Sequence, residues 1–222
     1  MQSTEENIDQ LEDIRKEYTL HSLDQSDVAK EPIQQFRIWM EAALKSKIEE
    51  PTAMTLATAS IDGLPDARIV LLKGITTEGF RFYTNYDSTK GKAIEENNQV
   101  ALVFHWSPLQ RQVRILGTAE KLSEADSEEY YHSRPKGSQI GAWASPQSEE
   151  ILDRDILEQK AAFLEDKYTD EQQLPKPTNW GGYLVKPTKV EFWQGRASRL
   201  HDRIAYEWQA EEQAWKIVRL AP

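Results

Sequence analysis

The stretch Ala53-Met-Thr-Leu-Ala-Thr-Ala59, followed by Asp62-Gly63 and then Arg68-Ile-Val-Leu-Leu-Lys73, decides the fold of this 222-residue chain. Its two apolar runs are typical of strands, and an Asp-Gly pair between such runs signals a hairpin turn. Further strands are predicted at residues 80–85, 100–106, 112–122, 183–185, 189–194, 203–208 and 215–220. Short strands joined by turns favour an antiparallel barrel over a parallel, doubly wound sheet.

Helices are predicted between these strands. Pro32 suits a first helical turn, and apolar residues at helical spacing continue to about Ile48. Ser123 and Asp126 resemble a capping box that opens a helix to about His132. Two more helices are expected at 88–97 and 153–168. The predicted class is therefore mainly β with flanking helices (α+β). One domain should span 31–222, preceded by a mobile polar arm over 1–30.

Composition excludes several classes of protein. The chain has 27 Lys and Arg against 37 Asp and Glu, a net charge of -10, which argues against nucleic acid or anionic membrane as partner. It has no cysteine, so disulfides and thiol catalysis are excluded, and a cytoplasmic location is the simplest expectation. The four histidines are scattered, which argues against a structural zinc site. Dinucleotide and nucleoside-triphosphate motifs are absent from the sequence.

The cations gather in a few short runs, the densest of which is Arg199-Leu-His-Asp-Arg203 after Glu191-Phe-Trp-Gln-Gly195. In an extended chain Arg199, His201 and Arg203 would share one face, where they repel unless an anion or a carboxylate lies among them. This pattern predicts a site for a planar, phosphorylated ligand. Asp202 should point away from His201, and no serine nucleophile stands out nearby, which disfavours a hydrolase triad.

Three other runs allow both a structural and a functional interpretation. Arg68 and Lys73 bracket a strand and would either extend to solvent or bind a ligand's anionic groups. Ser88-Thr89-Lys90 would either cap a helix or cradle a phosphate at its start. Gln112 would either lie on a solvated strand face or donate to a ring carbonyl.

A fourth run, His132-Ser-Arg-Pro135 with Gly137-Ser138, follows a predicted helix. A lone Arg-Pro usually marks only a helix end. Here Arg134 and Ser138, with Tyr130 one turn earlier, would be able to clamp a second phosphate.

Taken in order, these runs resemble the pyridoxine/pyridoxamine 5′-phosphate oxidase family. The motifs that carry the resemblance are Arg-Ile-Val-Leu-Leu-Lys at 68–73, Phe-Tyr-Thr-Asn at 82–85, Arg-Gln-Val at 111–113, His-Ser-Arg-Pro at 132–135, Ser-Gln-Ile-Gly-Ala at 138–142, Trp-Gly-Gly at 180–182, Glu-Phe-Trp-Gln-Gly at 191–195 and Arg-Leu-His-Asp-Arg at 199–203. Each motif is weak by itself, but the ordered set spans most of the chain.

The resemblance implies an antiparallel, Greek-key split β-barrel that forms a homodimer, with FMN bound at the subunit interface. It implies oxidation of pyridoxine or pyridoxamine 5′-phosphate to pyridoxal 5′-phosphate, with O2 reoxidising the flavin and releasing hydrogen peroxide. Two alternatives remain open: a flavin reductase or flavin carrier of the same fold, and a vitamin B6 phosphate carrier without turnover.

The resemblance also implies roles for particular residues. The implied FMN-binding residues are Arg68, Ile69, Val70, Leu71, Leu72, Lys73, Tyr83, Thr84, Lys90, Gln112, Gln147, Ser148, Trp193 and Arg203. The implied substrate-binding residues are Arg15, Tyr18, Lys73, Tyr130, Arg134, Ser138, Arg199, Leu200 and His201. Arg199 and His201 would either act as acid/base groups or only position the pyridine ring. Thr89 stands where many members carry arginine, which implies one charge fewer at the FMN phosphate.

Overall fold

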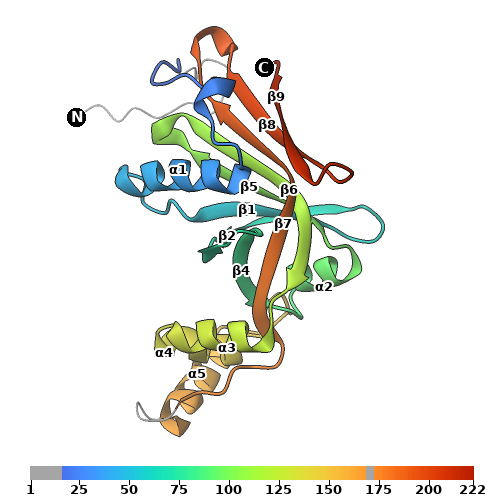
Figure 1. Cartoon of the computed structure of the whole chain (residues 1–222). Coiled ribbons are helices and arrows are strands. Elements are labelled where there is room, and N and C mark those ends of the chain that lie inside the picture. The colour runs from blue at the N-terminus through green and yellow to red at the C-terminus, as the bar shows by residue number, and fades with distance from the viewer. Residues whose placement is uncertain (1–16, 169–172) are drawn as a thin grey trace, which may run out of the picture.

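The computed structural model describes residues 17–168 and 173–222, which form an antiparallel sheet wrapped into a half-barrel with helices at one end (Figure 1). The strands are β1 Ala53–Ala59, β2 Pro65–Leu71, β3 Gly74–Ile75, β4 Phe80–Asn85, β5 Gln99–Trp106, β6 Arg111–Lys121, β7 Trp180–Gln194, β8 Asp202–Gln209 and β9 Ala214–Leu220. The helices are α1 Pro32–Lys45, α2 Thr89–Glu96, α3 Glu124–Ser133, α4 Lys136–Ala144 and α5 Asp155–Lys167.

The strand order is β2-β1-β5-β6-β7-β4-β3, with β8 paired to β7 and β9 to β8. The predicted hairpin joins β1 to β2, and Gly63 adopts a φ of +81° in its turn. The Gly63 N–H donates to the Ser60 carbonyl at 2.9 Å and closes the turn. A positive φ is the conformation that glycine adopts without steric cost, so the Asp-Gly signal is confirmed.

The main core lies between α1 and the buried face of the sheet. Alternate residues of β1 and β5 are buried, as expected for strands with one face against a core. Phe36 of α1 makes edge-to-face contacts with Phe80 and Phe104, at centroid separations of 4.8 and 5.0 Å. These fully buried rings fix the helix on the sheet and confirm the apolar face predicted for it.

The structure corrects the prediction of separate strands at 183–185 and 189–194, because β7 is one continuous strand of fifteen residues. Pro187 lies inside this strand, where a proline usually interrupts the pairing because it lacks a backbone N–H. The register instead shifts between Leu116 and Gly117 of β6, which places Gly117 opposite Pro187. A Cβ at Gly117 would lie 2.2 Å from the Lys186 carbonyl oxygen, so glycine allows the close approach.

Helices α3, α4 and α5 form a lobe with its own small core at the start of β7 (Figure 1). The residues of this core are Tyr131, Ile140, Ala144, Leu164, Leu174 and Trp180. Helix α4 had no counterpart in the sequence prediction, because Gly137 and Gly141 weaken the helical signal. The capping box at Ser123 is confirmed, since its side chain accepts from the Asp126 N–H. Within the described residues, no helix is long and apolar enough to cross a membrane.

Candidate active site

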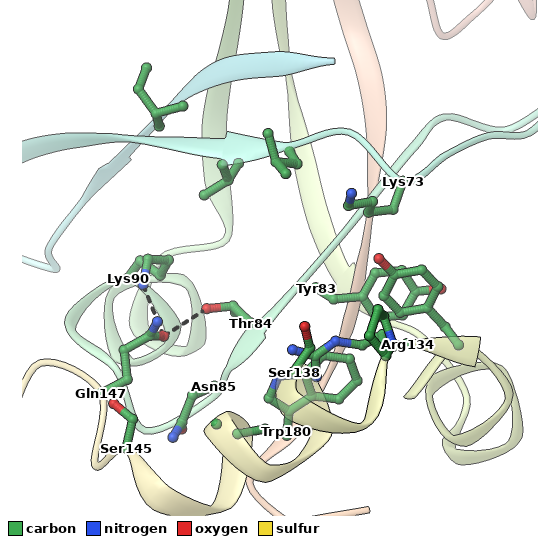
Figure 2. A pocket seen from close by; sticks show the side chains of 17 residues that line it. Lys73, Tyr83, Thr84, Asn85, Lys90, Arg134, Ser138, Ser145, Gln147 and Trp180 are labelled. Atoms are coloured by element: carbon green, nitrogen blue, oxygen red, sulfur yellow. Dashed lines mark hydrogen bonds between the residues drawn. The ribbon is translucent and has the colours of Figure 1, made fainter. Parts of the chain in front are cut away.

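A pocket of about 580 Å³ lies where β2, β4 and the start of β7 meet the helical lobe (Figure 2). This volume is in the range typical of small-molecule sites. The predicted site residues that line it are Ile69, Val70, Leu71, Lys73, Tyr83, Thr84, Lys90, Tyr130, Arg134, Ser138 and Gln147. A second groove of about 680 Å³, beside Trp208 and Trp215, is lined by none of the predicted site residues.

One end of the pocket is a polar cradle at the start of α2. Lys90 Nζ donates to Gln147 Oε1 at 3.2 Å, and Thr84 Oγ1 donates to the same oxygen at 3.1 Å (Figure 2). Lys90 Nζ also donates to Ser88 Oγ at 3.3 Å. Ser88 also caps the helix, so the structural interpretation of this run is confirmed. Burial, and then the positive charge of Arg68, lowers the pKa of Lys90. The charge of Lys90 meets only neutral partners among these hydrogen bonds, so this end favours an anion.

The other end holds Arg134, at the end of α3, with Lys73 and Ser138 nearby (Figure 2). Nη1 of Arg134 is buried and has no hydrogen-bond partner among the described residues. The guanidinium carbon lies 4.6 Å from the Trp180 ring centroid. A buried N–H without an acceptor is costly, so this geometry suits an anionic acceptor supplied by a ligand.

Aromatic rings form a wall beside Arg134. Tyr83 and Tyr130 stack at a centroid distance of 3.7 Å and an angle of 17°, and Trp180 lies nearly parallel, 5.6 Å from Tyr83. Burial raises the pKa of both tyrosines, which keeps the phenols neutral. The pocket therefore combines two cationic ends with flat aromatic surface.

Seven other predicted residues belong to a region at the far end of β7 that we call the C-terminal patch: Tyr18, Gln112, Trp193, Arg199, Leu200, His201 and Arg203. Gln112 lies opposite Trp193 in the β6–β7 register, and Trp193 lies opposite Arg203 in the β7–β8 register. Paired residues of antiparallel strands share a face, so these three side chains lie side by side across the sheet.

Arg203 has a carboxylate partner. Its Nε and Nη2 donate to Oε1 and Oε2 of Glu191 at 2.9 and 3.0 Å, and Arg114 approaches Glu191 at 3.5 Å. The Glu191 side chain is only 6% exposed. Glu191 is thus the carboxylate that the repulsion argument required beside Arg203.

The prediction that Arg199, His201 and Arg203 alternate along an extended segment is wrong. Residues Ala197–Arg199 form a 3₁₀ turn, in which Ser198 and Arg199 have φ values of +54° and +60°. His201 Nδ1 instead accepts a hydrogen bond from the Arg196 N–H at 3.1 Å. Burial and the charge of Arg199 lower the His201 pKa. The Asp202 carboxylate binds elsewhere, as the sequence predicted.

The pocket and the C-terminal patch do not meet within one chain. Trp180 lines the pocket and Trp193 lies in the patch, at opposite ends of β7. Thirteen residues apart on one strand, at about 3.3 Å per residue, they are roughly 40 Å from each other along the chain. Figure 1 shows β7 running from the helical lobe to the β8–β9 hairpin.

The remaining predicted residues have other surroundings. Arg68 bonds Thr58 Oγ1 at 2.8 Å and pairs with Asp66, beside the pocket rather than in its lining. The Leu72 side chain is buried in the core. Ser148 follows the pocket residue Gln147 with a φ of +73° and is not part of the lining. Arg15 lies outside the described residues.

Sequence reasoning gave no role to Trp180, Asn85 or Ser145, which also line the pocket. The Trp-Gly-Gly run was a usable signal for Trp180. A Cβ at Gly182 would meet the Tyr83 ring at 2.7 Å, so glycine there lets the aromatic wall close against β7. Nothing in the sequence around Ser145 marked it.

The fold and the pocket together define a split-barrel protein whose site suits a planar, phosphorylated ligand. Residues 40–168 match the family model described as "Pyridoxamine 5'-phosphate oxidase". Residues 180–222 match the model described as "Pyridoxine 5'-phosphate oxidase C-terminal dimerisation region". The chain belongs to the pyridoxamine 5′-phosphate oxidase family.

Named relatives agree with this membership. The chain is 54% identical over 213 residues to the pyridoxine/pyridoxamine 5′-phosphate oxidase of Cupriavidus pinatubonensis, covering 96% of this chain and 99% of that protein. The oxidase of Salinibacter ruber is 52% identical over 212 residues, with the same coverage. Among solved structures, PhzG from Burkholderia lata, in complex with tetrahydrophenazine-1-carboxylic acid, has a TM-score of 0.87 at 30% identity and covers 93% of this chain and 100% of that one.

Proposed function

We propose that this chain oxidises pyridoxine and pyridoxamine 5′-phosphates to pyridoxal 5′-phosphate, with FMN as cofactor and O2 as final electron acceptor. The observation that carries the proposal is a single pocket with two separate cationic ends, Lys90 at one and Arg134 with Lys73 at the other (Figure 2). FMN and the substrate are both phosphate esters of planar ring systems. One pocket with two anion sites and an aromatic wall suits that pair.

At the Lys90 end, Lys90, Thr84 and Arg68 would hold the FMN phosphate. Support comes from the lowered pKa of Lys90, caused by burial and by Arg68, which a dianionic ligand would reverse. The end of β2 from Ile69 to Leu71, with the following Leu72 and Lys73, would border the flavin ring, and Gln147 and Ser148 would lie beside it. Bound FMN would supply the redox chemistry by accepting a hydride from the substrate and passing the electrons to O2.

At the Arg134 end, Arg134, Ser138, Tyr130 and Lys73 would bind the substrate phosphate. The buried Arg134 Nη1 without a partner supports this role. Fixing the phosphate would orient the distant 4′ carbon, which must lie close to the flavin for hydride transfer. Two electrons leave that carbon. The alcohol gives the aldehyde directly, whereas the amine gives an imine that water converts to the aldehyde with release of ammonia.

A complete site would need two copies of the chain. Trp193, Arg199, His201, Gln112 and Arg203 lie at the far end of β7 from the pocket. Four of these five residues belong to the segment 180–222 that matches the family's dimerisation region. We therefore place the C-terminal patch of one copy over the pocket of the other, with FMN between them and Arg199 and His201 facing the pyridine ring.

The visible spectrum of the purified protein tests the proposal. Pyridoxine 5′-phosphate added without oxygen should bleach the flavin absorbance, and air should restore it with one peroxide released per turnover. A protein that binds flavin without bleaching would be a carrier or a reductase of another substrate, and the proposed reaction would be wrong. A colourless protein that does not take up FMN would refute the cofactor assignment as well.

A further inference from the structure

The carboxylate of Asp202 joins three parts of the chain in the C-terminal patch. Its Oδ2 accepts from the Leu23 N–H and from Arg196 Nη1, each at 3.0 Å, and its Oδ1 accepts from Arg219 Nη1 at 3.0 Å. Burial raises the Asp202 pKa, but the hydrogen bonds from Leu23, Arg219 and Arg196, together with the charge of Arg196, outweigh it, and the net shift is downward. The side chain is 17% exposed, so the ionised carboxylate acts as a largely enclosed junction.

The first part is the N-terminal segment, which crosses the patch. Leu23 is buried, and the Leu20 N–H donates to Gln110 Oε1 at 3.2 Å. Tyr18 packs on Gly195, where a Cβ would lie 2.7 Å from the Tyr18 Cγ. Its ring centroid is 5.8 Å from those of both Trp193 and His201. The hydrogen bond from the Leu23 N–H to Asp202 therefore also restrains Tyr18, whose ring packs against His201.

The second part is the turn that carries Arg196. The Arg196 N–H donates to His201 Nδ1, which fixes the neutral ring as the tautomer protonated on Nε2. Asp202 binds the Arg196 side chain and so restrains the residue whose backbone orients the imidazole. Asp202 thus acts on the neighbouring His201 indirectly, through Arg196 and Tyr18, although its own side chain points away from the imidazole ring.

We propose that Asp202 is a positioning residue for the oxidation reaction, because it locks the Tyr18 segment and the Arg196 turn around His201. This inference rests on the proposed function, in which His201 faces the pyridine ring. Asp202 itself would touch neither substrate nor flavin. The third partner, Arg219, anchors the junction to β9 and also pairs with Asp24 at 2.9 Å.

The charged groups around His201 determine in which direction its pKa should change when Asp202 is replaced. Arg199 lowers the His201 pKa, after burial, and the Arg196 N–H stabilises the neutral ring. Asp202, Arg196, Arg219 and Asp24 form the ion-pair cluster beside it. Loss of the Arg196 hydrogen bond should therefore raise the His201 pKa, because that bond favours the uncharged imidazole.

Asp202→Asn in the FMN-loaded protein tests the inference. We expect the His201 pKa to rise and its tautomer preference to weaken, measured by NMR of protein labelled with ¹⁵N-histidine and assigned with His201→Gln. We expect kcat/KM to fall about tenfold, since small displacements of positioned groups are costly, with flavin content unchanged. Asp24→Asn is the matched control, because it removes a charge from the same cluster but no contact to Arg196 or Leu23, and it should leave both readouts unchanged.

Arg196→Ala provides a second route if Asp202→Asn folds poorly, since the Arg196 side chain is 42% exposed. It should shift the His201 signals in the same direction, and the double variant should add little. Unchanged His201 signals in the folded variants would overturn the inference, as would an equal shift in Asp24→Asn. The NMR readout does not need turnover, so it stays decisive even if the oxidation itself is not observed.

Discussion

The pocket and the C-terminal patch both contain several cationic side chains, but these differ in whether they have a carboxylate partner. In the pocket, Arg134 has a buried N–H without a described partner, and Lys90 bonds only neutral side chains. In the patch, Arg203 is paired with Glu191, and beside the patch Arg196 is paired with Asp202. A cation without a carboxylate partner can bind an anionic ligand. A cation in an ion pair instead restrains the side chains around it. This difference is what the proposed function requires, in which the pocket would bind the phosphates and the patch would present oriented groups to the bound ligands.

The largest expected effect comes from separating the two regions onto different chains. Arg134→Ala damages the pocket and Arg199→Ala damages the patch, so each homodimer should be impaired at both sites. When the two variants are unfolded together and refolded, about half of the dimers are mixed, and each mixed dimer holds one intact site. Activity at low substrate should recover to about a quarter of the wild-type value. If activity does not recover, the two regions either act together within one chain or do not both belong to the active site.

Within the pocket, Arg134→Ala should raise the substrate KM at least tenfold, because a charged hydrogen bond contributes about 1.5–3 kcal/mol. Steady-state kinetics with pyridoxine 5′-phosphate measure the change. Arg154→Ala is the control, since this arginine, at the N-cap of α5, is 83% exposed and pairs with Glu158 of that helix. An unchanged KM in Arg134→Ala would reject the phosphate role.

Within the patch, Arg203→Ala should weaken FMN binding, measured as flavin retained after dialysis. The same change leaves Glu191 buried with only Arg114 at 3.5 Å, so part of the loss could come from an unpaired carboxylate. The double variant Arg203→Ala/Glu191→Gln separates the two causes. Flavin loss that persists in the double variant supports direct binding by Arg203, and full retention would limit Arg203 to its ion pair.

A smaller effect is expected in the pH profile. Burial and the charge of Arg199 lower the His201 pKa, so the ring becomes protonated at lower pH than an ordinary histidine does. If the reaction needs neutral His201, the acid limb of kcat/KM should lie at lower pH than an ordinary histidine would give. Arg199→Ala should move this acid limb to higher pH, because it removes the positive charge that lowers the His201 pKa. A limb that does not move would show that another group controls it.

The smallest effect is expected for Thr89→Arg, which adds a cation at the first residue of α2, beside Lys90. FMN should dissociate a few-fold more slowly, because the added charge would partly be screened by solvent. Flavin fluorescence during dilution measures the rate, and Thr89→Gln controls for side-chain size. An equal effect of both substitutions would mean that charge is not the cause.

Much of the fold followed from local pattern. The Asp62-Gly63 turn, the alternation in β1 and β5, and the cap at Ser123 are each specified by a few neighbouring residues. Strand β7 was predicted as two separate strands and helix α4 was missed, because distant contacts override local signals. Pro187 is accommodated by a register shift in β6, and the glycines of α4 are offset by burial of Ile140.

The site was predictable as a set of residues but not as an arrangement. Motifs named Lys90, Arg134 and His201, since their chemistry is unusual for packing alone. Spacing along the chain did not tell which end of β7 each would occupy. The turn at Ser198 and Arg199 was also invisible, because left-handed backbone at non-glycine residues depends on the surrounding structure.

Strand β7 begins in the pocket and ends in the patch, and this has a consequence for assembly. In the proposed arrangement, the cofactor and the substrate bind between two copies of the chain. They would therefore stabilise the dimer as well as take part in the reaction. Separating the copies by dilution would then abolish turnover rather than halve it, and stripping the flavin would loosen the pair. Holoprotein formation and quaternary structure would become one thermodynamically linked process.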